Sequence, residues 1–383
     1  MIMMASAEKR PFECSPIFII WMWLLFLFLK LITKDEVFTR GLPHKKGHEE
    51  LMNQIGIQVV STGAYLPAIE VANDDFTRIV ETSDEWISKR TGMKTRYLTA
   101  GEPTWMMGAM AAKRALESSN VAKENIDLVL FTTITGDFYT PSMACIAAKE
   151  LGLQNAVCYD LNCACSGFVY ALDMAYRYLA TGGAKNVLII SSEQISRILD
   201  YTDRATCVLF GDGAGAAVVT KADALYASCL GSDITGTTAL YARTPKITHP
   251  FVNEQNRVAV TDGFGDKSEK LFMDGKEVYK FATKIMPHAV EQACAKAGIA
   301  VQDLAMVIPH QANIRIIETA AQKLDIAQEK IYCNVDKYSN TSSATIPLAL
   351  DELNREDRLK RGDKLCVVGF GAGLTYGAAV FEW

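Results

Sequence analysis

The chain has 383 residues, of which 49% are hydrophobic, and a formal net charge of -5. A chain of this length and composition buries a large core, so we expect a globular protein built from two domains or two halves. The negative charge argues against a nucleic-acid partner, because binding to nucleic acid relies on a basic surface that neutralises phosphates.

An apolar segment, residues 17–32, lies near the N-terminus and contains a single charged residue, Lys30. A membrane-spanning helix needs about 20 apolar residues, so this segment is short for a full span. More lysine and arginine residues follow the segment than precede it, which favours a cytoplasmic location for the rest of the chain. Two interpretations of residues 1–51 stay open. They form a membrane anchor on the cytoplasmic face, or translation begins at Met52.

Strands and helices alternate along the first half of the chain. Continuous runs of Val, Ile and Leu predict buried strands, and Ala-rich runs between them predict helices. In chain order, the pattern predicts a strand at 55–60, a helix at 111–117, a strand at 127–131, a helix ending at 147–151, a strand at 157–161, a helix around 171–173, and strands within 183–190 and at 215–218.

The second half repeats this order, and an internal repeat is strong evidence about architecture. The pattern predicts a helix at 289–297, a strand at 305–309, a helix at 320–324, a strand at 331–335, a helix around 349–351, and strands within 362–368 and at 377–380. We therefore predict an α/β fold whose two halves, 52–225 and 226–383, are related by a pseudo-twofold axis.

Cys165 follows the strand predicted at 157–161 and precedes an Ala-rich helix. A thiol at a helix N-terminus is favoured as thiolate by the macrodipole, and the unpaired backbone N–H groups there can receive an oxyanion. Cys165 is therefore a candidate nucleophile for acyl transfer. The chain has 10 cysteines, scattered through apolar runs that are typical of reduced core residues. The Cys163-x-Cys165 pair has no further ligands at suitable spacing, so no metal site is expected.

Two further residues lie on loops that follow predicted strands of the second half. His310 follows the strand at 305–309, and Asn340 lies in a small polar loop. In the repeat, the Asn340 loop corresponds to the Cys165 loop, and ligands of open α/β sheets lie beyond the carboxyl ends of strands. We expect Cys165, His310 and Asn340 to meet. The alternatives are a hydrogen-bonded histidine at a strand end and an ordinary turn asparagine.

Two other patterns have simpler interpretations. The glycines at 211, 213 and 215 do not match a dinucleotide fingerprint, because β-like sequence follows them where a helix is required. Lys276, Lys280 and Lys284 would form one basic stripe on a helix. Such a stripe is usually a solvated face, and it gains meaning if an acidic protein delivers the substrate.

From about Ile55 to Trp383, the chain resembles the β-ketoacyl-acyl carrier protein synthase III family, condensing enzymes of the thiolase-like superfamily. The motifs that carry the resemblance are Thr82-Ser83-Asp84-Glu85-Trp86-Ile87, Arg90-Thr91-Gly92, Cys165-Ser166-Gly167-Phe168, Asp203-Arg204, Phe210-Gly211-Asp212-Gly213-Ala214-Gly215, Pro309-His310-Gln311-Ala312-Asn313 and Asn340-Thr341-Ser342.

The resemblance implies a five-layered αβαβα fold, a homodimer and a catalytic triad of Cys165, His310 and Asn340. It implies an acyl-CoA primer and malonyl-acyl carrier protein as substrates, with no cofactor. The primer acylates the cysteine, malonyl decarboxylation then gives an enolate, and the enolate attacks the acyl group. This reaction initiates fatty acid biosynthesis.

Further roles are implied only by the resemblance. The tetrahedral oxyanion would lie between the backbone N–H groups of Cys165 and Ala372. The coenzyme A site would comprise Trp86 and Arg204, which sandwich the adenine, with Arg90 and Asn313. The carrier-protein docking surface would include Lys276, Lys280, Lys284 and Arg315.

Two positions depart from the family pattern. Ala372 stands where glycine is frequent, which still leaves a backbone donor. Thr140 stands where some relatives carry a phenylalanine that closes the acyl pocket from across the dimer, so we expect primers longer than acetyl to be accepted.

A related condensing enzyme of secondary metabolism stays an alternative, and a non-catalytic membrane-tethered scaffold is a weaker one. A thiolase would require a second cysteine where this chain has Asn340.

Overall fold

The computed structural model describes residues 55–244, 251, 263–264 and 270–383, which belong to the compact unit Met52–Trp383. The segment 17–32 and the alternative start at Met52 lie outside the described residues. Within the described residues, no helix combines the length and the apolar character that crossing a membrane requires.

The first sheet has five strands in the order β1, β7, β6, β4, β5. Their bounds are β1 (Gly56–Tyr65), β7 (Asp212–Ala222), β6 (Asn186–Gln194), β4 (Leu128–Thr132) and β5 (Val157–Leu161). Strands β6, β4 and β5 run parallel, and β7 is antiparallel to both β6 and β1. The parallel core strand β4 is buried along its whole length, which explains why its first four residues are all apolar.

The second sheet repeats this arrangement with strands in the order β8, β13, β12, β11. Their bounds are β8 (Tyr226–Ser232), β13 (Thr375–Glu382), β12 (Lys364–Gly371) and β11 (Met306–Pro309). The prediction of a strand at 331–335 is wrong. This segment instead makes an isolated parallel bridge between Ile331 and Val307. The reason is that the Asn334 N–H bonds to the Gln311 side chain, and the chain then turns into the short helix α10 (Val335–Tyr338).

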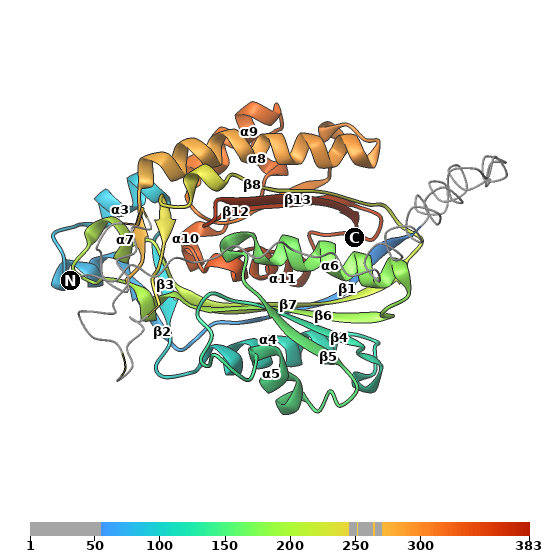
Figure 1. Ribbon diagram of the computed structural model, residues 1–383. Helices are drawn as coiled ribbons and strands as arrows, with labels where there is room; N and C mark the ends of the chain where they lie inside the picture. The colour runs from blue at the N-terminus through green and yellow to red at the C-terminus, as the bar shows by residue number, and fades with distance from the viewer. Residues whose placement is uncertain (1–54, 245–250, 252–262, 265–269) are drawn as a thin grey trace, which may run out of the picture. The chain divides into compact units, whose positions relative to one another are not determined.

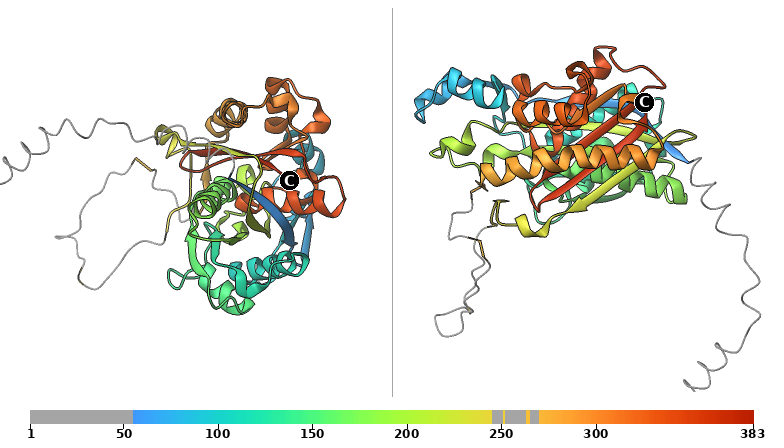
Figure 2. Two further views of the ribbon diagram at one scale, coloured as in Figure 1. Left: turned by 90° about the vertical axis from the view of Figure 1, so that its right-hand side faces the viewer. Right: turned by 90° about the horizontal axis from the view of Figure 1, so that it is seen from above.

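Helices fill three layers around the two sheets (Figure 1). Helices α6 (Gly167–Thr181) and α11 (Thr345–Arg355) lie between the sheets, within the largest apolar cluster. Helices α4 (Thr104–Ser118) and α5 (Met143–Leu151) cover the outer face of the first sheet, and α8 (Gly275–Ala297) and α9 (Ile314–Leu324) cover that of the second, as Figure 2 also shows. The predicted five-layered αβαβα fold is confirmed.

The two central helices begin in the same way. A 3-10 turn, Ala164–Ser166, precedes α6, and another, Ser342–Ala344, precedes α11. Ala164 and Ser342 hold equivalent positions in these turns, with φ of 45° and 53°. Positive φ is costly for residues other than glycine, and it persists where the surrounding structure demands it. The pseudo-twofold relation therefore brings two strained loops together.

Shorter elements surround this core. They are β2 (Ile69–Ala72), α3 (Asp84–Thr91), β3 (Thr95–Leu98), α7 (Arg204–Cys207), β9 (Leu240–Tyr241) and β10 (Phe272–Met273). Of these, α3 and α7 carry the residues expected to bind coenzyme A.

Candidate active site

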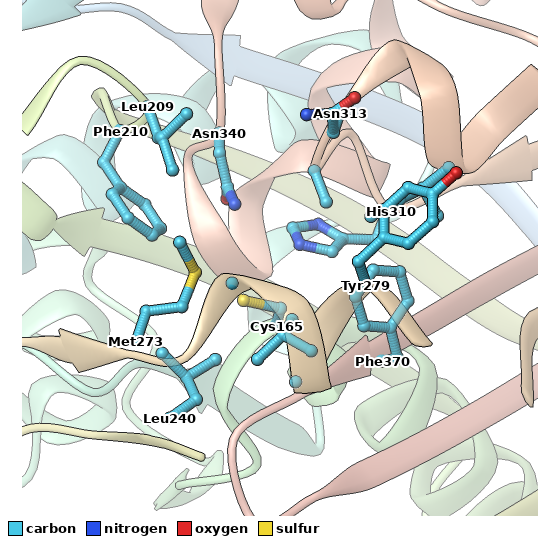
Figure 3. Close-up of a pocket in the computed structure, with 15 residues that line it drawn as sticks. Cys165, Leu209, Phe210, Leu240, Met273, Tyr279, His310, Asn313, Asn340 and Phe370 are labelled. Atoms are coloured by element: carbon cyan, nitrogen blue, oxygen red, sulfur yellow. The ribbon is translucent and has the colours of Figure 1, made fainter. Parts of the chain in front are cut away.

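One cavity of about 160 Å³ lies where the two halves meet at the starts of the central helices. Figure 3 shows the side chains of Cys165, His310 and Asn340 pointing into this cavity. Apolar groups form most of the remaining wall: Leu209, Phe210, Leu240, Met273, Val278, Tyr279, Ile316 and Phe370. The structure thus brings together the three residues that the sequence singles out, in a mostly apolar cavity.

Cys165 lies in the 3-10 turn that leads into α6, and only 7% of its surface is exposed. Its Sγ donates a hydrogen bond to the Ser342 hydroxyl oxygen at 3.5 Å. Cys165 therefore contacts the turn that begins α11, so both halves of the molecule fix its position.

The position of Asn340 is set by backbone and side chain together. Its N–H donates to the Leu209 carbonyl at 3.0 Å, and its carbonyl accepts from the Gly211 N–H at 3.0 Å. Its side-chain Oδ1 accepts the Ser342 N–H at 2.8 Å. Because the amide oxygen is bound in this way, the amide nitrogen is directed to the cavity as a donor.

His310 follows β11 directly, and its backbone N–H donates to the Val368 carbonyl at 2.7 Å. Its Nδ1 lies 2.7 Å from the Thr345 hydroxyl oxygen. The Phe370 ring meets the imidazole edge to face, with centroids 5.3 Å apart at an interplanar angle of 70°. These contacts fix the ring with Nε2 directed to the cavity.

Burial controls the charge of the site. It raises the pKa of the Cys165 thiol to about 12 and lowers the pKa of His310 to about 3. Both groups are therefore neutral in the resting protein at pH 7. Hydrogen bonds from Ser342 and from a backbone N–H favour the thiolate, but the loss of hydration opposes it more strongly, contrary to the thiolate that the sequence predicted. Forming a thiolate at Cys165 requires a group that accepts the thiol proton.

The predicted oxyanion site lies against a glycine. Gly371 ends β12 and packs on the Cys165 turn so closely that an added Cβ would lie 2.6 Å from the Cys165 backbone nitrogen. Ala372 follows it, and its carbonyl accepts from the Thr375 hydroxyl at 3.2 Å. The close approach of β12 places the backbone of both segments beside Cys165.

The residues expected to bind coenzyme A gather around α3. The guanidinium carbons of Arg90 and Arg204 lie 4.3 Å and 4.8 Å from the Trp86 ring centroid. Asn313 caps α9 through the Arg315 N–H and donates to the Arg90 carbonyl at 3.1 Å, while its side chain also lines the cavity. This cluster thus connects the surface to the cavity.

Lys276, Lys280 and Lys284 project from the exposed face of α8, as the spacing predicted. Arg315 lies on the first turn of α9, and its guanidinium donates to the Lys89 carbonyl at 2.8 Å. Arg315 also borders a groove of about 490 Å³ with Trp86, Lys89 and Arg90. Cationic side chains therefore lie on the surface beside the predicted coenzyme A residue Trp86.

Thr140 is exposed, in the loop between β4 and α5, and it lies outside the cavity of its own chain. Phe138 and Tyr139, its neighbours, are 56% and 91% exposed. A role of Thr140 in the acyl pocket stays a prediction, because it depends on a second subunit.

Four residues beside Cys165, His310 and Asn340 were not predicted to have roles: Glu193, Ser342, Thr345 and Phe370. Phe370-Gly371 was visible as the repeated Phe-Gly ending of each half, and Ser342 belongs to the Asn340 motif. Glu193 was visible as a lone acid at the end of an apolar strand. Thr345 and Phe370 contact His310 within the second half, whereas Ser342 reaches Cys165, and Glu193 reaches Ser342, across the two halves. Sequence spacing gives neither kind of contact.

Comparison with known proteins agrees with this geometry. Residues 159–235 match the family model described as 3-oxoacyl-[acyl-carrier-protein] synthase III, and residues 294–383 match the model for its C-terminal part. The chain is 46% identical, over 85% of its length and 98% of the relative, to a β-ketoacyl-[acyl-carrier-protein] synthase III of Clostridium acetobutylicum.

Solved structures agree as well. The 3-oxoacyl-[acyl-carrier-protein] synthase III of Aquifex aeolicus matches with a TM-score of 0.78 at 39% identity, covering 86% of this chain and 100% of that one. A priming β-ketosynthase of the R1128 polyketide pathway matches with a TM-score of 0.76 at 34% identity, covering 85% of this chain and 96% of the other. The chain therefore belongs to the 3-oxoacyl-[acyl-carrier-protein] synthase III family of condensing acyltransferases.

Proposed function

We propose that Cys165, His310 and Asn340 carry out the decarboxylative condensation of an acyl-CoA primer with malonyl-acyl carrier protein, the first condensation of fatty acid synthesis. The observation that carries this proposal is the convergence of a thiol, an imidazole and a carboxamide on one apolar cavity. Covalent catalysis by the thiol would keep the primer in place while CoA leaves and the carrier protein enters. No cofactor is needed for either step.

In the first half-reaction, the Cys165 thiolate attacks the thioester carbonyl of the primer. The tetrahedral oxyanion would lie between the backbone N–H groups of Cys165 and Ala372, a position that the tight packing of Gly371 on the Cys165 turn supports. Positioned donors of this kind are usually worth about 3–4 kcal/mol each.

In the second half-reaction, the malonyl group loses CO2 and its thioester oxygen becomes an enolate. The Asn340 amide donates to this oxygen, since its own oxygen is bound by the Ser342 N–H. His310 donates from Nε2 when Nδ1 accepts a hydrogen bond, and the Thr345 hydroxyl lies close enough to supply it. The low pKa of His310 keeps the ring neutral through this step.

The adenine of coenzyme A would stack between Trp86 and Arg204, with Arg90 and Asn313 nearby. A base that stacks on both groups needs about 7 Å between the Trp86 ring and the Arg204 guanidinium. In this structure the guanidinium carbon lies 4.8 Å from the ring centroid. Arg204 is exposed and must swing away to admit the base. We expect Trp86→Ala and Arg204→Ala to raise the KM for acyl-CoA and to leave kcat largely unchanged.

The acidic carrier protein would dock on Lys276, Lys280, Lys284 and Arg315. These residues are exposed on α8 and α9, the helices that contribute Val278, Tyr279 and Ile316 to the cavity wall. Because cations on a protein surface steer an anionic partner, this contact would act chiefly on the association rate. Its dependence on salt would distinguish it from the coenzyme A contact.

We further propose a cytoplasmic homodimer whose halves are 52–225 and 226–383 in each chain. The edge strand β5, with Val157 58% exposed, and the exposed Phe138-Tyr139 pair lie on the surface that would face a partner. Thr140 would then reach the partner's acyl pocket. Its small side chain leaves room for medium-chain primers, and strict preference for acetyl-CoA over medium-chain acyl-CoA would contradict this.

The test of the proposed function is intact-mass detection of acylation over a panel of acyl-CoAs, using wild type and Cys165→Ala. We expect one acyl group on wild type and none on the variant. Acylation that survives in Cys165→Ala would refute the assignment. Adding malonyl-acyl carrier protein and identifying the product by mass separates fatty acid initiation from a secondary-metabolism condensation, which the similarity to a polyketide priming enzyme keeps as the second candidate.

A further inference from the structure

Glu193 is a fully buried carboxylate beneath the nucleophile, at the end of β6, and the mechanism above gives it no role. One oxygen, Oε2, accepts from the Thr133 and Thr135 hydroxyls and from the Ile134 N–H, at 2.9–3.1 Å. The other oxygen, Oε1, accepts from the Ser343 hydroxyl at 2.8 Å and from the Ser342 hydroxyl at 3.2 Å. A carboxylate held in this way is fixed in position toward the Cys165 turn.

The hydrogen bonds from the thiol to this carboxylate run in one direction. Cys165 Sγ donates to the Ser342 hydroxyl oxygen at 3.5 Å, and that hydroxyl donates to Glu193 Oε1 at 3.2 Å. Among the described residues, the hydrogen bond of the thiol goes to Ser342 and not to His310. The strained φ of 53° at Ser342 sets its hydroxyl between the two groups.

We propose that Glu193 receives the thiol proton of Cys165 through the Ser342 hydroxyl. This inference rests on the proposed role of Cys165 as nucleophile. The S–H bond breaks as an O–H bond forms on Ser342, and the original Ser342 proton moves to Glu193. The thiolate attacks the thioester, and CoA leaves as a thiolate that takes a proton from solvent. When the condensation product is expelled, Cys165 recovers its proton along the same path.

Electrostatics favour this sharing of one proton. Burial raises the pKa of Glu193, and a charged Glu193 in turn raises the pKa of Cys165, so a thiolate and a carboxylate are not stable together at this depth. The titratable group that Glu193 faces is Cys165, through Ser342. His310 lines the cavity on the other side of Cys165 and bonds to Thr345 instead. The other hydrogen-bond partners of Glu193 are hydroxyls and one N–H, which do not titrate near neutral pH.

The test is the pH dependence of Cys165 alkylation by iodoacetamide, followed by peptide mass spectrometry in the full chain. When Cys165 and Glu193 share one proton, the fraction of thiolate stays constant between the two apparent pKa values of the pair. The alkylation rate of wild type should therefore show a plateau around neutral pH. In Glu193→Gln and in Ser342→Ala the plateau should give way to a rise of about tenfold per pH unit. Near pH 7, acylation by acyl-CoA should fall about 100-fold in both variants.

Two control variants separate proton transfer from packing. Ser343→Ala removes a hydroxyl that bonds to Glu193 but does not touch Cys165. Asp212→Asn removes the charge of another fully buried carboxylate, which accepts from Thr99 and Ser196 away from the cavity. Both should keep the plateau. Alanine fits at Ser342, because Ala164 adopts a similar φ in the equivalent turn.

The rival acceptor is His310. If Glu193 takes the proton, His310→Asn keeps the plateau and Glu193→Gln loses it. A plateau that survives in Glu193→Gln, that is absent from wild type, or that disappears equally in the two controls overturns the proposal. These results leave the proposed function standing as long as acyl-CoA still labels wild-type Cys165 and not Cys165→Ala.

Discussion

Gly371→Ala is the substitution whose effect the structure defines most sharply. The added Cβ would lie 2.6 Å from the Cys165 backbone nitrogen and 3.2 Å from the Cβ atoms of Ala164 and Cys165. An ordinary contact is about 3.5 Å, so the Cys165 turn and β12 must separate by about 0.9 Å. The obstacle is backbone and cannot rotate away.

A displacement of this size acts on catalysis more than on folding. Overpacking a close-packed interior costs about 1–3 kcal/mol, which a domain of this size tolerates. An oxyanion donor moved by nearly 1 Å loses most of its effect, so we expect the rate of Cys165 acylation to fall about 100-fold. Intact-mass measurements on samples quenched at successive times after adding acyl-CoA give this rate, and thermal unfolding gives the stability.

Gly369→Ala is the matched control, two residues earlier on the same strand. Its Cβ would lie 3.2 Å from the Cys165 carbonyl oxygen, which requires a shift of only a few tenths of an ångström. We expect less than about a tenfold loss of acylation there, since the donor nitrogen stays in place. The reasoning is refuted if Gly371→Ala acylates at the wild-type rate, or if both glycine variants lose activity equally.

Three further predictions follow from the site. Burial lowers the pKa of His310 to about 3 in the folded protein. As the pH falls below about 6.5, this side chain is therefore protonated in the unfolded chain but not in the folded protein, which favours unfolding. Wild type should therefore lose about 2 kcal/mol more stability between pH 7 and pH 5 than His310→Asn, and equal losses in chemical denaturation would contradict this. Asn340→Ala should slow malonyl decarboxylation about 100-fold while Cys165 is still acylated at near the wild-type rate. The double variant Lys280→Glu with Lys284→Glu should lower kcat/KM for malonyl-acyl carrier protein by about tenfold at low salt. The rate at which acyl-CoA acylates Cys165 should not change. A loss in both half-reactions would argue against a docking role.

Local sequence patterns identified most strands and helices of the two halves. They worked where a strand is buried on both faces, as in β4, or where a helix is rich in alanine, as in α4. They failed at 331–335, where a hydrogen bond from the Asn334 N–H to the Gln311 side-chain oxygen replaces the sheet ladder. That bond joins residues that are distant in the chain, and no local pattern predicts it.

The sequence by itself determined the layered α/β architecture, its repetition and the three residue types of the site, because periodicity and motif spacing are local properties. Only the tertiary structure decided the state of those residues. Burial raises the pKa of Cys165 and lowers that of His310, and it leaves both neutral. Glu193 and Ser342 came within reach of the thiol because the two halves bring distant loops together, and both desolvation and contact depend on that approach.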